Sequence, residues 1–295
     1  MSIPSMIPNM QYAIQQSDQS LATALQQVST GKRVNQLSDD PAASANMVRS
    51  LASSANIDQY TANVTALQSR LQSADSAISS VVSSLNQAVT LGTQGANSTV
   101  SASNRQAIAV QVQGILTDVV AQANSSYQGS YLFAGSNTGA APFVASSSSP
   151  NGYSYNGNST VNTAQIGQST SVSTNIPGDQ LFTSGANVIG SLTQLVTALQ
   201  SGSSAQIGTA STAITSALNY LDQQRTPLSN TISQLNSQES YLSQETVTLS
   251  SQQSALTGIN LAQAATNLTQ AETAHTAILA AAGQALPTTL LSYLK

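Results

Sequence analysis

The chain has 295 residues, of which 40% are hydrophobic and only 6% are charged, with a net charge of −4 at pH 7. This apolar fraction can form a buried core, whereas an ordinary globular domain carries about a quarter charged residues. The seven Lys and Arg residues form no basic patch, which argues against nucleic-acid binding, and the absence of Cys excludes disulfides and thiol chemistry. A polar surface with little charge repels copies of itself weakly, so it favours dense self-packing.

The first apolar periodicity predicts a helix over residues 9–30. Ile14, Leu21 and Val28 recur every seven residues, and Gly31 is well placed to end this helix. Asp39, Asp40 and Pro41 then predict the start of a second helix. An Asp side chain accepts the free backbone N–H groups of a helix start, and Pro at the first helical position loses no hydrogen bond.

The second helix is predicted to be long, because no Pro or Gly interrupts residues 42–91. We expect it to break at Gly92 and Gly95, and we expect Ser103 to cap a third helix that packs back on it. A heptad ladder on the second helix predicts a seam of the bundle core, formed by Ile57, Val64, Leu71, Ile78 and Leu85.

Residues 136–180 differ in composition from the helical segments. From about residue 128, Gly, Ser, Asn and Pro become frequent, and short alternating runs such as Tyr153–Tyr155 replace the heptads. This predicts a small β domain inserted between helices. Its aromatic residues are more simply explained as a core than as a sugar-binding platform.

The C-terminal half returns to helical spacing at Val188 and, after a break near Gly202 and Gly208, reaches a leucine ladder. This ladder predicts the second seam of the bundle core, formed by Leu221, Leu228, Leu235, Leu242 and Leu249, and continues to Leu256. Past Gly258, a last helix has mostly Ala on its apolar side and therefore buries little area.

These elements predict a mainly α fold, a long antiparallel coiled-coil helix bundle built from both chain ends with a small inserted β-rich domain. The expected parts are a terminal coiled-coil domain (1–40 with 256–295), a helical bundle domain (41–135 with 181–255) and the β domain (136–180).

The residues suggest no catalytic, cofactor-binding or metal site. His275 is the only histidine, so a triad or a histidine-based metal site lacks partners. Helix capping fully explains Asp39 and Asp40, and no glycine-rich loop has the strand, helix and Lys of a phosphate site. We therefore expect that the chain is not an enzyme.

The two ends resemble the bacterial flagellin superfamily. The N-terminal motif of this superfamily is similar to the segment Leu25–Pro41, which contains Ser29-Thr-Gly-Lys-Arg33 and Ser38-Asp-Asp40. The C-terminal motif is similar to the segments Ile259–Ala271 and Leu290–Lys295. Pro41 stands where flagellins usually carry Ala. The blocks Gly129–Gly135, Pro142-Phe143 and Ile176–Phe182 resemble the hook-associated branch of the superfamily.

The resemblance implies a structural subunit of the bacterial flagellum, which forms a junction ring between the hook side and the flagellin filament. Implied partners are further copies of the chain, hook-associated protein 1, flagellin, and an export chaperone on the C-terminal segment, with no nucleic acid and no membrane. It also implies an extracellular location reached through the flagellar type III apparatus, and residues 1–10 have no signal-peptide pattern. The expected subunit interface consists of Ile14, Leu21, Val28, Leu261, Leu268, Ile278 and Leu279.

Two alternatives remain open at this point. The chain is a short flagellin that forms the filament itself, or it is a secreted adhesin or binding protein that uses the β domain with the helices as a stalk. Pro41 and the Tyr131-Leu-Phe-Ala-Gly135 block argue against the flagellin alternative.

Overall fold

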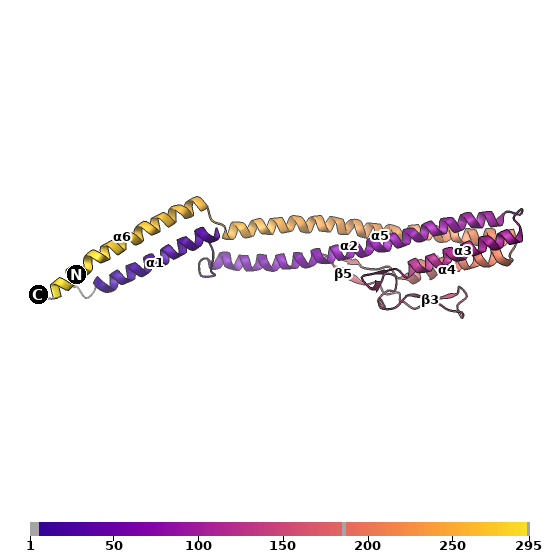
Figure 1. The fold of residues 1–295 in the computed structure, drawn as a ribbon, viewed down its shortest axis with the longest axis horizontal. Helices are drawn as coiled ribbons and strands as arrows, with labels where there is room; N and C mark the ends of the chain where they lie inside the picture. Colours follow the sequence, from indigo (N-terminus) through magenta and orange to yellow (C-terminus); the bar gives the residue numbers. More distant parts are fainter. Residues whose placement is uncertain (1–5, 185–186, 294–295) are drawn as a thin grey trace. The chain divides into compact units, whose positions relative to one another are not determined.

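The computed structural model of the chain describes residues 6–184 and 187–293, and these residues form six α-helices and six short strands (Figure 1). The predicted mainly α fold with a small β part is confirmed. Residues 1–5, 185–186 and 294–295, which the predicted domains include, lie outside the described residues. The helices are α1 (Met6–Thr30), α2 (Pro41–Ala96), α3 (Ala102–Ala123), α4 (Val188–Ser201), α5 (Ser204–Thr257) and α6 (Leu261–Tyr293).

The chain divides into two compact units. Unit 1 comprises residues 1–56 and 244–295, and unit 2 comprises residues 57–243. Unit 1 contains α1, α6, the first turns of α2 and the last turns of α5. Unit 2 contains α3, α4, the remaining parts of α2 and α5, and all six strands.

Helices α2 and α5 run antiparallel, as polar contacts along them show. In unit 1, Gln253 on α5 donates to Ser50 on α2. In unit 2, Gln68 on α2 donates to Asn236, and Arg225 on α5 pairs with Asp75. Residues later in α2 contact residues earlier in α5, so the two long helices run in opposite directions.

The predicted break of α2 at Gly92 and Gly95 is wrong, because the helix continues to Ala96. Both glycines are buried against neighbouring helices. A Cβ at Gly92 would lie 2.2 Å from Oγ of Ser211, and one at Gly95 would lie 2.3 Å from Cδ2 of Leu199. These glycines therefore permit close helix packing instead of ending the helix.

Two further helix boundaries differ from the sequence prediction. Ser101, rather than Ser103, caps α3, and its side chain accepts a hydrogen bond from the backbone N–H of Asn104 at 3.2 Å. Helix α5 begins at Ser204, so Gly208 lies inside it and only Gly202 belongs to the break after α4. Nothing lies within 4 Å of a Cβ placed at Gly208, so packing does not require glycine there.

The numerous Ser and Thr residues of the long helices bond back to their own backbone. Ser69, Ser76, Thr90 and Thr212, for example, each donate to the carbonyl four residues earlier. Such bonds satisfy the hydroxyl groups without charge but add little to helix stability. The buried apolar stripes must therefore supply most of the stability of these helices.

Three antiparallel hairpins form the β part of unit 2. They are β1–β2 (Ser126–Tyr127, Ser130–Tyr131), β3–β4 (Phe143–Ala145, Tyr153–Tyr155) and β5–β6 (Thr163–Gln165, Ser171–Ser173). The first hairpin lies before the predicted start of the β domain at residue 136. Its two-residue turn is formed by Gln128 and Gly129, which both have positive φ, as this tight type of hairpin turn requires.

Four aromatic residues form a core in this part of the chain. Phe182 makes edge-to-face contacts with Phe133 and Phe143, at centroid distances of 5.3 and 5.5 Å, and all three rings are buried. The Tyr155 ring lies 5.1 Å from Phe143, and its hydroxyl donates to the backbone oxygen of Phe133. Partial burial raises the pKa of the Tyr155 hydroxyl above its usual value. These rings are engaged with one another, which leaves no free aromatic platform among them.

We expect Gly135→Ala to destabilise this segment. Gly135 has a φ of 70°, and a Cβ there would lie 2.1 Å from the backbone oxygen of Asn158. The substitution is expected to cost about 1–3 kcal/mol or more in the free energy of unfolding. Gly139→Ala is the matched control, because its Cβ meets nothing within 4 Å. Urea denaturation followed by near-ultraviolet circular dichroism measures both, and equal stability of the two variants would contradict this account.

Candidate functional site

Helices α1 and α6 of unit 1 pack side by side (Figure 1), and their contact buries only small side chains. Its buried side chains are small, namely Ser17, Ala24, Ala264 and Ala282. The larger apolar residues Ile14, Leu21, Val28, Leu268 and Ile278 are only half-buried. Leu261 and Leu279 are exposed, at 61% and 45%. All seven residues expected at a subunit interface therefore retain accessible apolar surface.

The single histidine bridges this helix pair. Nε2 of His275 on α6 lies 2.7 Å from Oδ1 of Asp18 on α1. Asp18 is mostly exposed, and a solvated pair of this kind contributes at most about 1 kcal/mol. The histidine is thus part of a helix–helix contact, and no second titratable side chain is paired with it in the part of the chain that the structure describes.

Residues 31–40, which we call the connector, form an ordered turn between α1 and α2. Oδ1 of Asp40 accepts from the backbone N–H of Ala43 at 2.9 Å, so Asp40 caps α2, and Pro41 is the first residue of the helix. The predicted capping role of Asp39 is wrong, because its side chain bonds to the connector and not to α2. Its Oδ2 accepts from the backbone N–H groups of Asn35 and Gln36 and closes the turn.

Arg33 fastens the connector to the end of α5. Its backbone N–H donates to the Thr257 carbonyl at 2.6 Å, and its guanidinium donates both to the carbonyl of Leu256 and to Oδ2 of Asp40. Lys32 and Gly258 form an isolated antiparallel bridge beside it. Arg33 therefore has a structural role in fixing the connector.

Acid is expected to weaken the connector. The backbone N–H of Ala43 and, secondarily, Arg33 hold the pKa of Asp40 below its ordinary value of 3.8, and the N–H groups of Asn35 and Gln36 do the same for Asp39. Because the folded pKa is the lower one, this stabilisation is complete above the ordinary value and is lost as the pH falls through the lowered pKa.

An Asp40→Asn variant isolates this effect, because Asn also caps a helix but does not ionise. We expect the thermal midpoint of the Asn variant to fall less than that of the wild type between pH 5 and pH 2. Asp118→Asn, which removes a carboxylate from unit 2, is the charge-matched control. Identical pH profiles for Asp40→Asn and the wild type would refute the role of the Asp40 charge.

The ten ladder residues predicted to form the bundle core are all buried, whereas Leu256, at the end of the leucine ladder, is half-buried. Polar pairs interrupt the seam between α2 and α5 in unit 2. Arg225 forms a two-point ion pair with Asp75, at 3.0 and 3.1 Å, and this pairing is the main reason that the pKa of Arg225 is raised. Gln68 is buried and donates to both Asn236 and Glu239. Because a shifted register would leave these groups unpaired, the pairs favour one alignment of the helices.

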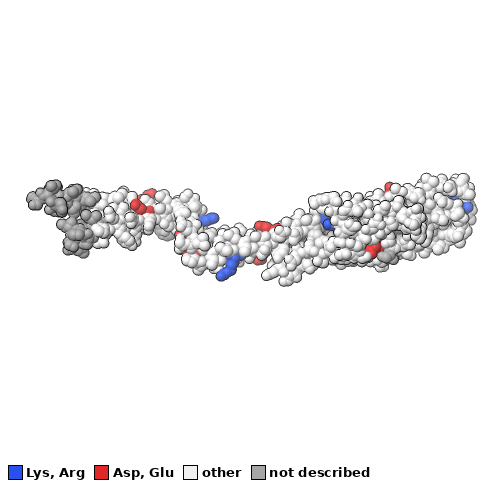
Figure 2. All heavy atoms as spheres, turned by 90° about the horizontal axis from the view of Figure 1, so that it is seen from below, with Lys and Arg blue, Asp and Glu red and all other residues white. Residues whose placement is uncertain are grey.

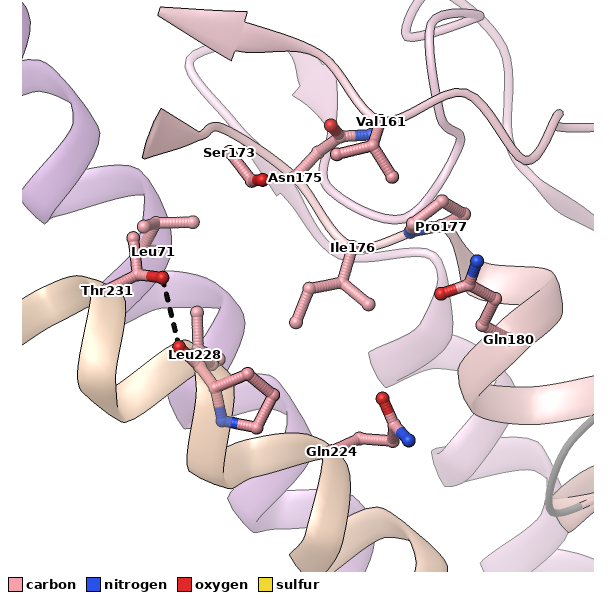
Figure 3. A pocket seen from close by; sticks show the side chains of 11 residues that line it. Leu71, Val161, Ser173, Asn175, Ile176, Pro177, Gln180, Gln224, Leu228 and Thr231 are labelled. Atoms are coloured by element: carbon pink, nitrogen blue, oxygen red, sulfur yellow. Dashed lines mark hydrogen bonds between the residues drawn. The ribbon is translucent and has the colours of Figure 1, made fainter. Parts of the chain in front are cut away.

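A pocket of about 210 Å³ lies in unit 2 between α2, α5 and the segment after β6 (Figure 3). Ile176 points toward Leu71 and Leu228, and the amides of Gln180 and Gln224 lie at its edge. None of its lining side chains is titratable, so the pocket has no general acid or base and none that would activate the hydroxyls of Ser173 and Thr231. Within the described residues, no three His, Asp or Glu side chains are grouped as metal ligands, and no helix has the length and hydropathy needed to cross a membrane.

Large exposed apolar side chains are concentrated in unit 1. Eight of the twelve among the residues with described side chains belong to it, although it is the smaller unit; they are Tyr12, Leu25, Leu37, Val48, Leu51, Val247, Leu261 and Leu279. Charged atoms, by contrast, are sparse on the face shown in Figure 2. Exposed apolar groups gathered on a weakly charged surface indicate a protein-contact surface. Sequence reasoning missed Leu37, Val48 and Leu51, because they lie outside the heptad ladders.

Comparison with known proteins places these features in a family context. Residues 3–138 match the family model of the bacterial flagellin N-terminal helical region. Over 119 residues, which are 40% of this chain, the sequence is 35% identical to flagellar hook-associated protein 3 of Salmonella typhimurium. The chain spans 38% of the length of that relative. These matches confirm the resemblance to the flagellin superfamily predicted from sequence.

Solved structures match over a larger part of the chain. A flagellar hook-associated protein of Vibrio parahaemolyticus superposes with a TM-score of 0.69 and 21% identity, covering 75% of this chain and 100% of that one. The flagellar junction protein FlgL of Legionella pneumophila gives a TM-score of 0.59 and 17% identity, with coverage of 72% and 100%. At these identities the two structures establish a shared fold.

Proposed function

We propose that this chain is a hook-associated structural protein of the flagellin superfamily and that it forms the junction between the hook side and the filament of a bacterial flagellum. The observation that carries the proposal is the sequence match to hook-associated protein 3, supported by a fold shared over the full length of a junction-protein structure. The concentration of exposed apolar residues in unit 1 gives the proposal a physical basis.

Assembly in this proposal depends on the α1–α6 pair. Its half-buried residues would complete their burial against neighbouring copies, at about 25 cal/mol for each Å² removed from water. Each contact is small, but a closed ring joins every subunit to two neighbours, so weak contacts accumulate into a stable assembly. The low charge of the chain keeps repulsion between packed copies small.

Several finer points belong to the same proposal. The domain division predicted from sequence would place 1–40 with 256–295 at the assembly surface and 136–180 at the periphery. Further copies, hook-associated protein 1 and flagellin would be the neighbours, and a chaperone would hold the C-terminal segment before export through the flagellar type III apparatus. The role is structural and extracellular, with no enzymatic step.

The two alternatives have weaker support. A short flagellin would share the N-terminal match, but the relative from Salmonella typhimurium is a hook-associated protein, and Pro41 departs from the usual flagellin residue. An adhesin would need a binding face on the β segment, where Phe133, Phe143, Tyr155 and Phe182 form a core instead.

Deletion of the gene tests the proposal in the bacterium that carries it. A strain without this protein is expected to retain hooks, to lack filaments, and to release unassembled flagellin into the medium. Expression of the chain from a plasmid should restore filaments. Filaments of normal length in the deletion strain would overturn the junction role.

A further inference from the structure

Leu37 is the most exposed large apolar side chain among the residues with described side chains, at 75%. It lies in the connector, and the hydrogen bonds of that turn hold its backbone. Asp39 accepts from Asn35 and Gln36 at 2.9 and 2.8 Å, and Arg33 ties the turn to Thr257. A side chain presented on an ordered turn loses little backbone entropy on binding. Leu37 therefore has the properties of a preorganised apolar knob.

Unit 1 also contains an open groove of about 540 Å³, which we call the Arg49 groove. It lies between the first turns of α2 and the last turns of α5, and its lining includes Arg49, Ser53, Leu249, Ala255 and Leu256. Leu37 of the same chain is not among its lining residues. The groove thus offers apolar surface that its own connector does not cover.

The charges near the knob and the groove are complementary. Arg49 donates to Asn46 at 2.9 Å and has no ion pair within residues 6–184 and 187–293. The carboxylate of Asp39, two residues from Leu37, accepts only backbone N–H groups in the same part of the chain, and those bonds keep its pKa low, so that it is ionised at neutral pH. The cation beside the groove and the anion beside the knob have opposite signs, which favours a contact between the two surfaces.

We propose that Leu37 of one copy inserts into the Arg49 groove of a second copy, where Asp39 approaches Arg49. The knob and the groove are different surfaces, so the contact is head-to-tail: the first copy keeps its groove free and the second copy keeps its knob free. Such a contact can repeat around a ring. The inference rests on the proposed function only for its biological setting, because the contact itself is a property of two chains in solution.

Disulfide trapping tests the contact directly, because the chain has no cysteine and any thiol is an introduced one. Leu37→Cys and Ala255→Cys chains are purified separately, one of them with a mass tag, then mixed and oxidised over a concentration series. One thiol per chain prevents intrachain bonds, so the heterodimer on a non-reducing gel reports the proposed contact. Because the disulfide is covalent, the trapped heterodimer accumulates even when only a small fraction of the chains is in contact at any time.

The matched control replaces the knob by Val110→Cys, a side chain of unit 2 that is 66% exposed. We expect the Leu37→Cys mixture to form heterodimer about tenfold faster than the Val110→Cys mixture, because the docked thiols share a high effective concentration. Arg49→Glu, added to the groove chain, should reduce this advantage by placing two carboxylates together.

Equal heterodimer rates for the knob and the control overturn the proposal, and so does an advantage that Arg49→Glu leaves unchanged. The experiment uses no flagella. A failed junction role in the deletion strain and a failed knob-and-groove contact in the trapping experiment are therefore separate results.

Discussion

A Leu21→Asp variant is expected to lose assembly and swimming motility while unit 2 stays folded. Leu21 is half-buried on α1, within the thin contact with α6. A carboxylate there would have to be desolvated when a neighbouring copy covers the helix pair, at a cost of several kcal/mol per buried charge. Circular dichroism of the purified variant and motility of a complemented deletion strain measure the two effects.

Leu21→Met is the control for this prediction. It keeps the volume and the apolar character of the side chain, so it is expected to preserve motility. Normal motility in the Leu21→Asp strain would be fatal to the account of α1 as an assembly surface. Collapse of the helical signal of unit 2 would show instead that the two units do not fold independently.

The second large effect is expected from Phe182→Ala. Phe182 is fully buried and contacts both Phe133 and Phe143, so its removal leaves a cavity at the centre of the aromatic core. Truncation of a buried Phe costs about 3–5 kcal/mol. We expect the free energy of unfolding of unit 2 to fall by this amount, with loss of the near-ultraviolet signal from the aromatic residues.

Val144→Ala is the control in the same segment, because Val144 is an exposed residue of β3. Its effect on the unfolding free energy is expected to stay within about 0.5 kcal/mol. A Phe182→Ala variant as stable as Val144→Ala in urea would show that the aromatic contacts contribute little to the β segment.

The heptad ladders made most of the helical architecture predictable from sequence. Apolar residues repeat every seven positions in each ladder, as Ile57 and Val64 do in the first and Leu221 and Leu228 in the second. Such a repeat is typical of helices that pack lengthwise. The cap at Asp40 was also predictable, because its chemistry is local.

Features that depend on distant neighbours were not predictable in the same way. Gly92 was expected to end a helix, yet it is retained inside α2 because Leu195 and Ser211 approach it closely. Arg225 pairs with Asp75, which lies 150 residues away in the sequence. Local sequence patterns do not predict these contacts, because they join residues that are far apart in the sequence.

In the candidate site, too, some features were predictable from the sequence and others were not. The apolar periodicity predicted helices at Leu21 and Leu268, but not how much of each side chain the α1–α6 pair would leave accessible. Leu37 belongs to no periodic pattern, and its exposure follows from the turn that Asp39 closes.

Immunogold electron microscopy of intact flagella, with antibodies against this chain, tests the central claim most directly. The account predicts gold confined to the boundary between the hook and the filament, with no label in a strain deleted for the gene. Label along the whole filament, or absence of label from flagella, would contradict it.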